Sequence, residues 1–147
     1  MFEELKSIPL SGKEYPIKCD MLVLEKIQEE YGTIGEFEQA IMTWEPELDS
    51  DGNQIVDEEG KTKYHGKFPA ARAVNDALIW MVNEGEAVTA EAEGRAAVQY
   101  SREEIVRKAD LTLTDLANKL HDEFYRCFRV KNAETTQRTE ETEKADQ

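Results

Sequence analysis

The segment from Asp20 to Ile41 constrains the fold most strongly, because it carries a start signal and a stop signal for each of two helices. Asp20 can cap the first helix by accepting a backbone N–H bond, and Gly32 supplies the left-handed residue that ends it. Thr33 and Glu36 have the spacing of a capping box, which restarts the chain as a second helix. We therefore expect two short helices that meet at one glycine.

Both helices carry apolar residues at helical spacing, which predicts that one side of each faces a core. The second helix is expected to reach Trp44 and to end at Pro46, because proline does not continue a helix. The two apolar stripes are Leu24, Ile27 and Tyr31 in the first helix, and Ile34, Phe37, Ile41 and Trp44 in the second.

Three further helices are expected later in the chain. Residues 68–85 have so wide an apolar surface that we expect the central, most buried helix there. Residues 86–100 are rich in alanine, and their pattern does not distinguish a frayed helix from a loop. Residues 101–110 begin with a capping box and predict a short helix. The last helix begins at Thr112 or Thr114, with the stripe Leu116, Leu120, Phe124 and Phe128.

Two segments have the pattern of β-hairpins. Residues 5–18 contain two short apolar runs around the turn Ser11-Gly12-Lys13, and their two prolines suit edge positions. The insertion at residues 45–67 is acidic first and basic later. It predicts an exposed loop or a second hairpin, with strands at Gln54–Val56 and Lys61–Tyr64.

These elements predict a mainly α (α+β) fold, in which an N-terminal β-hairpin packs on a small bundle of about four to five helices. The chain of 147 residues is long enough for one core, so we expect a single domain over residues 1–130. Residues 131–147 contain no large apolar side chain. We expect a disordered polar tail there, because burial cannot offset the entropy of ordering it.

The net charge of -14 narrows the classes of partner. An acidic surface repels the phosphates of nucleic acids and the anionic lipids of membranes, so neither is expected as a partner. The two cysteines, Cys19 and Cys127, lack the spacing of a redox or metal motif. Neither an export signal nor a membrane-length apolar stretch is apparent. We therefore expect a reduced, cytoplasmic setting.

No enzyme class is indicated, since the sequence has no nucleophile motif and no phosphate-binding glycine loop. No cofactor is expected. The nearest approach to a ligand site is the loop from Glu47 to Glu58, where Asp49, Asp51 and Glu58 fall at positions three, five and twelve of a calcium loop. An acidic β-turn loop explains the same residues more simply, so calcium stays the lesser hypothesis.

Three short motifs resemble those of the tail assembly chaperones of long-tailed bacteriophages and prophages. Gly12 to Lys18 resembles a hairpin motif of that family, written GKEYP, an apolar residue and lysine. Glu29 to Gly32 resembles its EEYG helix end, and Asn83 to Gly85 its NEG helix end. The resemblance spans most of residues 5–128, and the insertion at residues 45–67 departs from the shorter family pattern.

The resemblance implies a helical, non-enzymatic protein that binds the tape measure protein in the host cytoplasm and is absent from the mature virion. Tail tube subunits are a second implied partner, and homo-oligomerisation stays open. If the second helix presents its apolar face to the partner, Phe37, Ile41 and Trp44 are the candidate contacts. Two other classes are weighed: a calcium-binding module that uses residues 47–58, and an acidic inhibitor that mimics DNA.

Overall fold

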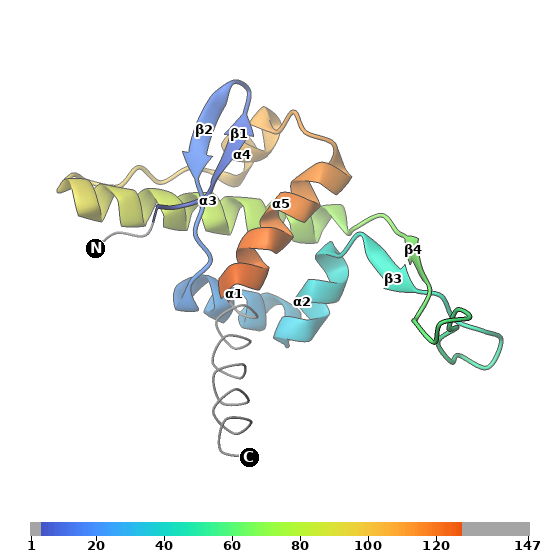
Figure 1. Cartoon of the computed structure of the whole chain (residues 1–147). Helices are drawn as coiled ribbons and strands as arrows, with labels where there is room; N and C mark the ends of the chain where they lie inside the picture. The colour runs from blue at the N-terminus through green and yellow to red at the C-terminus, as the bar shows by residue number, and fades with distance from the viewer. Residues whose placement is uncertain (1–3, 128–147) are drawn as a thin grey trace, which may run out of the picture.

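The computed structural model describes residues 4–127 and confirms the predicted α+β class. These residues form five helices and two antiparallel two-stranded sheets (Figure 1). In chain order the elements are β1 (Ser7–Leu10), β2 (Lys13–Pro16), α1 (Met21–Tyr31), α2 (Ile34–Ile41), β3 (Trp44–Pro46), β4 (Tyr64–Gly66), α3 (Ala71–Glu93), α4 (Arg102–Lys108) and α5 (Leu113–Tyr125).

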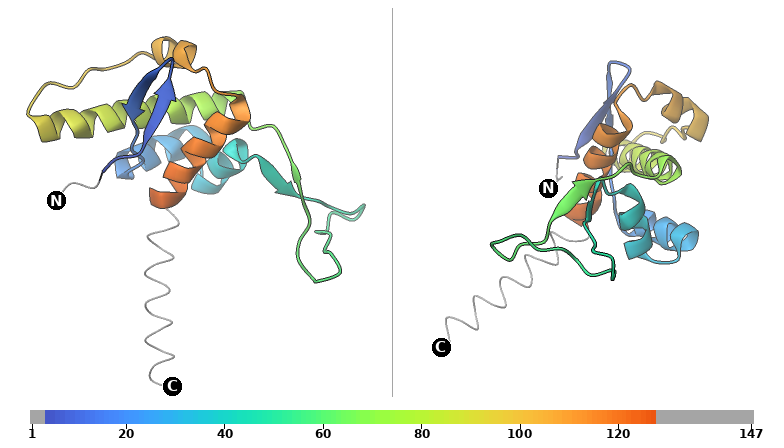
Figure 2. Two further views of the ribbon diagram at one scale, coloured as in Figure 1. Left: turned by 45° about the horizontal axis from the view of Figure 1, so that its top comes forward. Right: turned by 90° about the vertical axis from the view of Figure 1, so that its right-hand side faces the viewer.

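The long helix α3 is the centre of the molecule, as its wide apolar surface predicts (Figure 1). It contacts β2 and all four other helices. Figure 2 shows α1 and α2 along one side of α3 and the β1–β2 hairpin on another. Its apolar residues face several neighbours at once, and Val74, Ala77, Leu78, Met81 and Val82 are almost completely buried.

The predicted N-terminal hairpin is present, and its strands pair from Leu10 and Lys13 outward. Ile8 lies opposite Tyr15, and both side chains are buried against the helices. The turn residues Ser11 and Gly12 have φ angles of 51° and 81°. Positive values at both central positions are typical of the tight turns that match the twist of a two-residue hairpin.

The hairpin crosses α3 at Gly85, and the two backbones approach too closely for a side chain there. A Cβ atom on residue 85 would lie 2.1 Å from the carbonyl oxygen of Pro16 and 2.8 Å from the nitrogen of Ile17. Just beyond the crossing, the backbone N–H of Lys18 donates to the carbonyl of Met81 on α3 at 3.0 Å. Only glycine fits this crossing without displacing the hairpin.

The structure decides the path of residues 86–100, which the sequence leaves open. Helix α3 continues to Glu93 and ends at Gly94, whose φ of 69° is left-handed. The chain then runs back along α3, and the side-chain amide of Asn83 exchanges two hydrogen bonds with the backbone of Tyr100, at 2.9 and 3.0 Å. These bonds satisfy the backbone N–H and carbonyl of Tyr100, which a neighbouring strand would otherwise do.

Glu86 and Arg95 attach the start of this returning segment to α3. The buried Glu86 carboxylate receives both Nη atoms of Arg95, at 2.8 and 3.0 Å, and the backbone N–H of Val98 at 2.8 Å. The hydrogen bonds from Arg95, with the bond from Val98, lower the pKa of Glu86 to about 2. Its charge is therefore retained throughout the neutral range.

The side-chain caps of the helices are the best-predicted feature of the fold. Asp20 accepts the backbone N–H groups of Leu22 and Val23 at 3.1 and 3.2 Å, and Thr33 accepts that of Glu36 at 3.0 Å. Gly32 ends α1 with a φ of 80°. The caps of α4 and α5 are Ser101 and Thr112, as their capping sequences predict.

Helix α5 closes the core opposite α1 and α2. Phe124 packs edge-on against Phe37 with ring centroids 5.5 Å apart. The buried Glu123 accepts the backbone N–H of Cys19 at 2.6 Å and two donors of Arg126, which in turn donates to the Cys19 carbonyl. The expected stripe residue Phe128 and the predicted tail at residues 131–147 lie outside the described residues.

Two predicted boundaries are wrong. Helix α2 stops at Ile41, and Trp44 begins strand β3, because Pro46 forces the residue before it into an extended conformation and β4 pairs with the same segment. Helix α3 begins at Ala71, a few residues later than predicted. Ala70 donates its backbone N–H to the carbonyl of Ala40 at 2.8 Å, which keeps the chain extended up to that point.

Within residues 4–127, no helix combines the length and the apolar character that crossing a membrane requires.

The crossing at Gly85 predicts that Gly85→Ala lowers the free energy of unfolding by about 3 kcal/mol or more, since backbone atoms must move to admit the methyl group. Thermal and urea unfolding measure this loss. Gly35→Ala in α2 is the matched control, because its Cβ would meet nothing nearer than 4.0 Å. Equal stability of the two variants would contradict the close crossing.

A carboxylate pair between α1 and α3 predicts a pH-dependent stability. The hydrogen bond that Glu84 shares with Asp20 raises the pKa of Glu84 to about 7, with partial burial and repulsion from Asp20 adding to the rise and Lys18 and Lys26 opposing it. The folded state therefore binds more protons than the unfolded state between pH 4.5 and about 7. The contribution of Glu84 to the free energy of unfolding rises as the pH falls through this range.

Glu84→Gln is expected to be more stable than the parent above pH 7, with the difference shrinking as the pH approaches 4.5. Urea unfolding at several pH values measures it. Glu91→Gln, an exposed carboxylate on the same helix, is the control and should show no such pH-dependent difference. A Glu84→Gln effect that is constant with pH would contradict the shared proton.

Candidate protein-binding site

Residues 44–66 form an arm that projects away from the helices in all three views (Figures 1 and 2). Its base is the β3–β4 ribbon, in which Trp44 lies opposite Gly66 and Pro46 opposite Tyr64. Beyond the ribbon, isolated bridges pair Leu48 with Gln54 and Val56 with Thr62. The predicted second hairpin is confirmed in part, because Gln54, Val56 and Thr62 pair, but the regular strands lie at its base.

The outer arm is a duplicated tight turn. Residues 49–53 and 57–61 share the pattern Asp-x-x-Gly-x, eight positions apart. In each copy the aspartate Oδ1 accepts two backbone N–H bonds at 2.9 Å, and the glycine has a φ near 80°. The left-handed glycine completes a three-residue hairpin loop. This short repeat is a sequence signal for two turns, which the prediction of a loop or a single second hairpin does not include.

The base of the arm has one charged face and one apolar face, because successive residues of a strand point to opposite sides. Glu45 and His65 pair on the charged face at 2.8 Å. On the other face, Trp44, Pro46 and Tyr64 come together. Trp44 and Tyr64 expose 58% and 57% of their surface, which is unusual for adjacent large aromatic residues.

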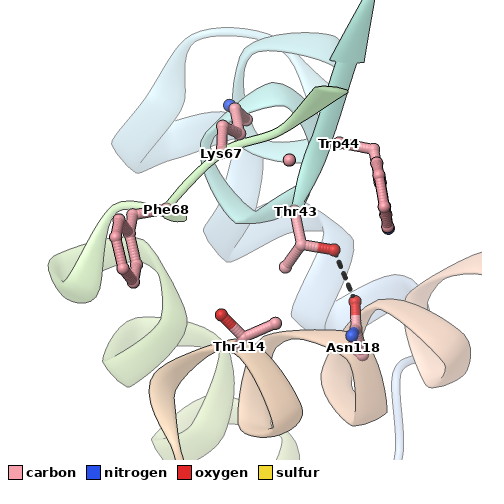
Figure 3. A pocket seen from close by; sticks show the side chains of 7 residues that line it. Thr43, Trp44, Lys67, Phe68, Thr114 and Asn118 are labelled. Atoms are coloured by element: carbon pink, nitrogen blue, oxygen red, sulfur yellow. Dashed lines mark hydrogen bonds between the residues drawn. The ribbon is translucent and has the colours of Figure 1, made fainter. Parts of the chain in front are cut away.

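The apolar face continues into a groove between the arm and the N-terminal half of α5. The groove has a volume of about 340 Å³ and is lined by Thr43, Trp44, Gly66, Lys67, Phe68, Thr114 and Asn118. Figure 3 shows Trp44 and Phe68 on opposite sides of it. Thr43 and Asn118 form a hydrogen bond of 2.8 Å between them, which ties the base of the arm to α5.

Lys67 lines the groove, but its charge is already engaged. Its ammonium group donates to the carbonyl of Gln39 in the last turn of α2. A cation at this helix end is favourable, because the last carbonyls of a helix carry partial negative charge. The side walls of the groove are the aromatic rings of Trp44 and Phe68. Its polar groups are the hydroxyl and amide groups of Thr43, Thr114 and Asn118.

The structure separates the three residues that the sequence nominates as partner contacts. Phe37 and Ile41 are completely buried, so their assignment to a binding surface is wrong, and they belong to the core. Trp44 remains exposed, although it lies on a strand instead of the predicted helix. The sequence-based candidates do not include Leu48, Tyr64 and Phe68, which are also large, apolar and exposed. The alternation of apolar and acidic residues from Trp44 to Leu48 is a sequence signal for Leu48, whereas Tyr64 and Phe68 have no such local signal.

The predicted calcium ligands do not assemble. Asp49 uses its carboxylate to hold the first turn, while Glu58 lies in the second turn. Within residues 4–127, no group of three or more histidine, cysteine, aspartate or glutamate side chains is placed to hold a metal ion. The acidic turns account for these residues, as the simpler hypothesis predicts. The hypothesis of a DNA mimic stays a prediction.

Another cluster of polar side chains serves to join helices. Asp76 on α3 accepts the hydroxyl of Tyr31 at 2.7 Å and also binds the guanidinium of Arg102 at the start of α4. Burial and the bond to Asp76 raise the pKa of Tyr31. Among the described residues no buried side-chain N or O atom lacks a hydrogen-bond partner, so this cluster serves to position α1, α3 and α4.

The different burial of Trp44 and Phe37 predicts different losses of stability when each is replaced by alanine. Trp44→Ala should change the free energy of unfolding by no more than about 0.5 kcal/mol, because the ring is exposed. Phe37→Ala should lower it by about 3–5 kcal/mol, since it leaves a cavity beside Phe124. Urea unfolding compares the two variants, and a large loss in Trp44→Ala would instead place the indole in the core.

Comparisons of this chain with models of known protein families, with curated proteins and with solved structures gave no match. Its function must therefore be inferred from its own residues.

Proposed function

We propose that this chain is a tail assembly chaperone of the kind found in long-tailed bacteriophages and prophages. It acts as a non-enzymatic binding protein in the host cytoplasm, where it holds the tape measure protein soluble until the tail assembles. Tail tube subunits are its second partner, and it is absent from the mature virion. The observation that carries the proposal is the exposed aromatic groove at the base of an acidic arm.

The aromatic groove has the character of a protein-binding surface. Large aromatic side chains that are exposed together, with polar residues around them, mark sites where another chain binds. Aromatic residues also contribute most to binding energy in such interfaces. Trp44 and Phe68 expose 58% and 84% of their surface, so the free protein leaves considerable apolar area in contact with water.

The motifs that carry the family resemblance support the proposal in a second way, because two of them contact each other. The Gly12–Lys18 hairpin end crosses α3 at the glycine of Asn83–Gly85. The third motif, Glu29–Gly32, supplies Tyr31, which binds Asp76 of the same helix. Residues that resemble one family at three separate places thus contribute to one structural unit around α3.

The net charge of -14 also suits a protein that keeps a partner in solution. A tape measure protein has long apolar helices, and such surfaces aggregate when water is their only neighbour. Covering part of them with a strongly charged domain gives the complex a large net charge and keeps complexes apart. The chaperone role therefore needs no reactive group, only a stable surface with apolar and acidic parts.

Co-expression tests the proposal. The tape measure protein that is encoded with this chain should be soluble and co-purify when both are made together, and it should precipitate when made alone. Trp44→Asp should remove most of the co-purified partner, because it replaces an aromatic contact with a charge that the apolar face of the partner would cut off from water. The amount of soluble partner on a gel measures the effect.

Tyr125→Asp is the matched control, since Tyr125 is an exposed aromatic residue near the far end of α5. It should leave co-purification and the circular dichroism spectrum unchanged. If the unsubstituted protein neither binds the tape measure protein nor keeps it soluble, the proposed chaperone function is wrong.

A further inference from the structure

We propose that the aromatic groove binds a cationic amphipathic helix, with large apolar side chains on one face and lysine or arginine residues along both flanks. The proposal rests on the proposed function in one respect: it identifies which kind of tape measure segment this site takes. It follows from the walls of the groove, the charge of the arm, and the protection of the β3 edge by a proline.

The groove accommodates apolar side chains of a partner, not its backbone. Its volume of about 340 Å³ is at the lower end of the range of about 300–1,000 Å³ that is typical of ligand pockets. Trp44 and Phe68 form two aromatic walls across it (Figure 3). One or two leucine, methionine or phenylalanine side chains can insert between these rings, as the anchors of a helix do in a protein groove.

The arm carries an uncompensated negative charge next to the groove. Residues 45–67 contain seven carboxylates and three lysines. Glu45 pairs with His65, and Glu59 pairs with Lys61. Among the residues that the structure describes, the other five carboxylates of the arm form no ion pair: Glu47, Asp49, Asp51, Asp57 and Glu58. A partner with lysine or arginine beside its apolar anchors neutralises this charge.

The aromatic rings favour the same partner. Lysine and arginine side chains bind the faces of tryptophan and tyrosine rings, and the attraction strengthens when water is removed. Trp44 and Tyr64 expose their rings beside the acidic outer arm. A cation on the partner can therefore contact a ring and a carboxylate together, whereas an acidic helix would be repelled at both places.

A partner strand is less suitable than a helix. Strand addition requires a row of free backbone donors along an edge. Glu47 donates its N–H inward to Lys63 at 2.9 Å, so the preceding Pro46 occupies an outward position of β3. Proline has no N–H to offer, and it protects this edge from pairing. At the β3 edge, contact through side chains, as with a helix, remains.

Two occupants from this chain itself are also unsuitable by composition. The segment 131–147 has no large apolar residue and more acidic than basic residues, so neither its side chains nor its charge match the groove. A second copy of the chain would bring two acidic arms together, and each copy has a net charge of -14. The complementary occupant is therefore a basic helix of another protein.

Peptide binding tests the inference without any natural partner. The probe is a fluorescein-labelled synthetic peptide of about 18 residues, or five helical turns, with leucine and phenylalanine on one face and lysine on the flanks. Fluorescence anisotropy measures its Kd for the full-length protein. A peptide in which every lysine is replaced by glutamate should bind at least about tenfold more weakly, and so should a scrambled peptide without an apolar face.

Variants of the protein locate the binding. Phe68→Ser and Trp44→Ala should each raise the Kd at least about tenfold while circular dichroism and urea unfolding stay unchanged. Tyr125→Ala should not change the Kd. A triple variant removes charge from the arm: Glu47→Gln, Asp51→Asn and Glu58→Gln. It should bind the lysine peptide more weakly and with a smaller dependence on salt. The control is the double variant Glu91→Gln, Glu103→Gln on α3 and α4, which should change neither the Kd nor its salt dependence.

The inference is overturned if the glutamate or scrambled peptide binds as well as the lysine peptide, or if Phe68→Ser and Trp44→Ala bind it unchanged. Its failure is distinct from failure of the proposed function. If the tape measure protein still co-purifies with both groove variants, the groove is not its binding site, and the proposed chaperone function stands. If the protein binds the lysine peptide but does not retain the tape measure protein, the groove is a binding site, and the proposed chaperone function is wrong.

Discussion

The contact between Gly85 and the Pro16–Ile17 backbone is the constraint on which the arrangement of the core depends. It brings the N-terminal hairpin against α3 at backbone distance, where a single methyl group would not fit. The residues around it extend the same junction: Asn83 holds the returning Tyr100 segment, and Glu84 meets the cap of α1. Because these contacts all fall within one turn of α3, the hairpin, α1 and the returning segment are positioned together.

The arm is built on a different principle. Its shape comes from two local turns and a short ribbon, and its base is held to the helices by the bonds from Thr43 to Asn118 and from Lys67 to Gln39. Little of its surface is buried, so aromatic side chains stay available to another molecule. A packed core that carries an acidic arm with one exposed apolar face is suited to binding, since the core holds its shape while the base of the arm presents the groove.

Local signals allowed most elements to be predicted, and the failures have identifiable causes. The caps at Asp20, Thr33, Ser101 and Thr112 act within a few residues, so they could be identified without any tertiary information. Trp44 was misplaced because its spacing from Ile41 fits a helix as well as the start of a strand. The groove was missed because it joins Trp44 and Phe68 to α5, and nothing local to these segments indicates that they meet.

The amino-acid sequence alone determined the side-chain caps of the helices, the hairpin turn and the acidic charge, because each depends on neighbouring residues or on composition. The tertiary structure decided which apolar residues are core and which are surface. Phe37 and Trp44 look alike in a helical pattern, yet one is packed against Phe124 and the other faces water. Burial depends on which distant segments come together, and that is settled by the packing around α3 and not by the spacing of residues along the chain.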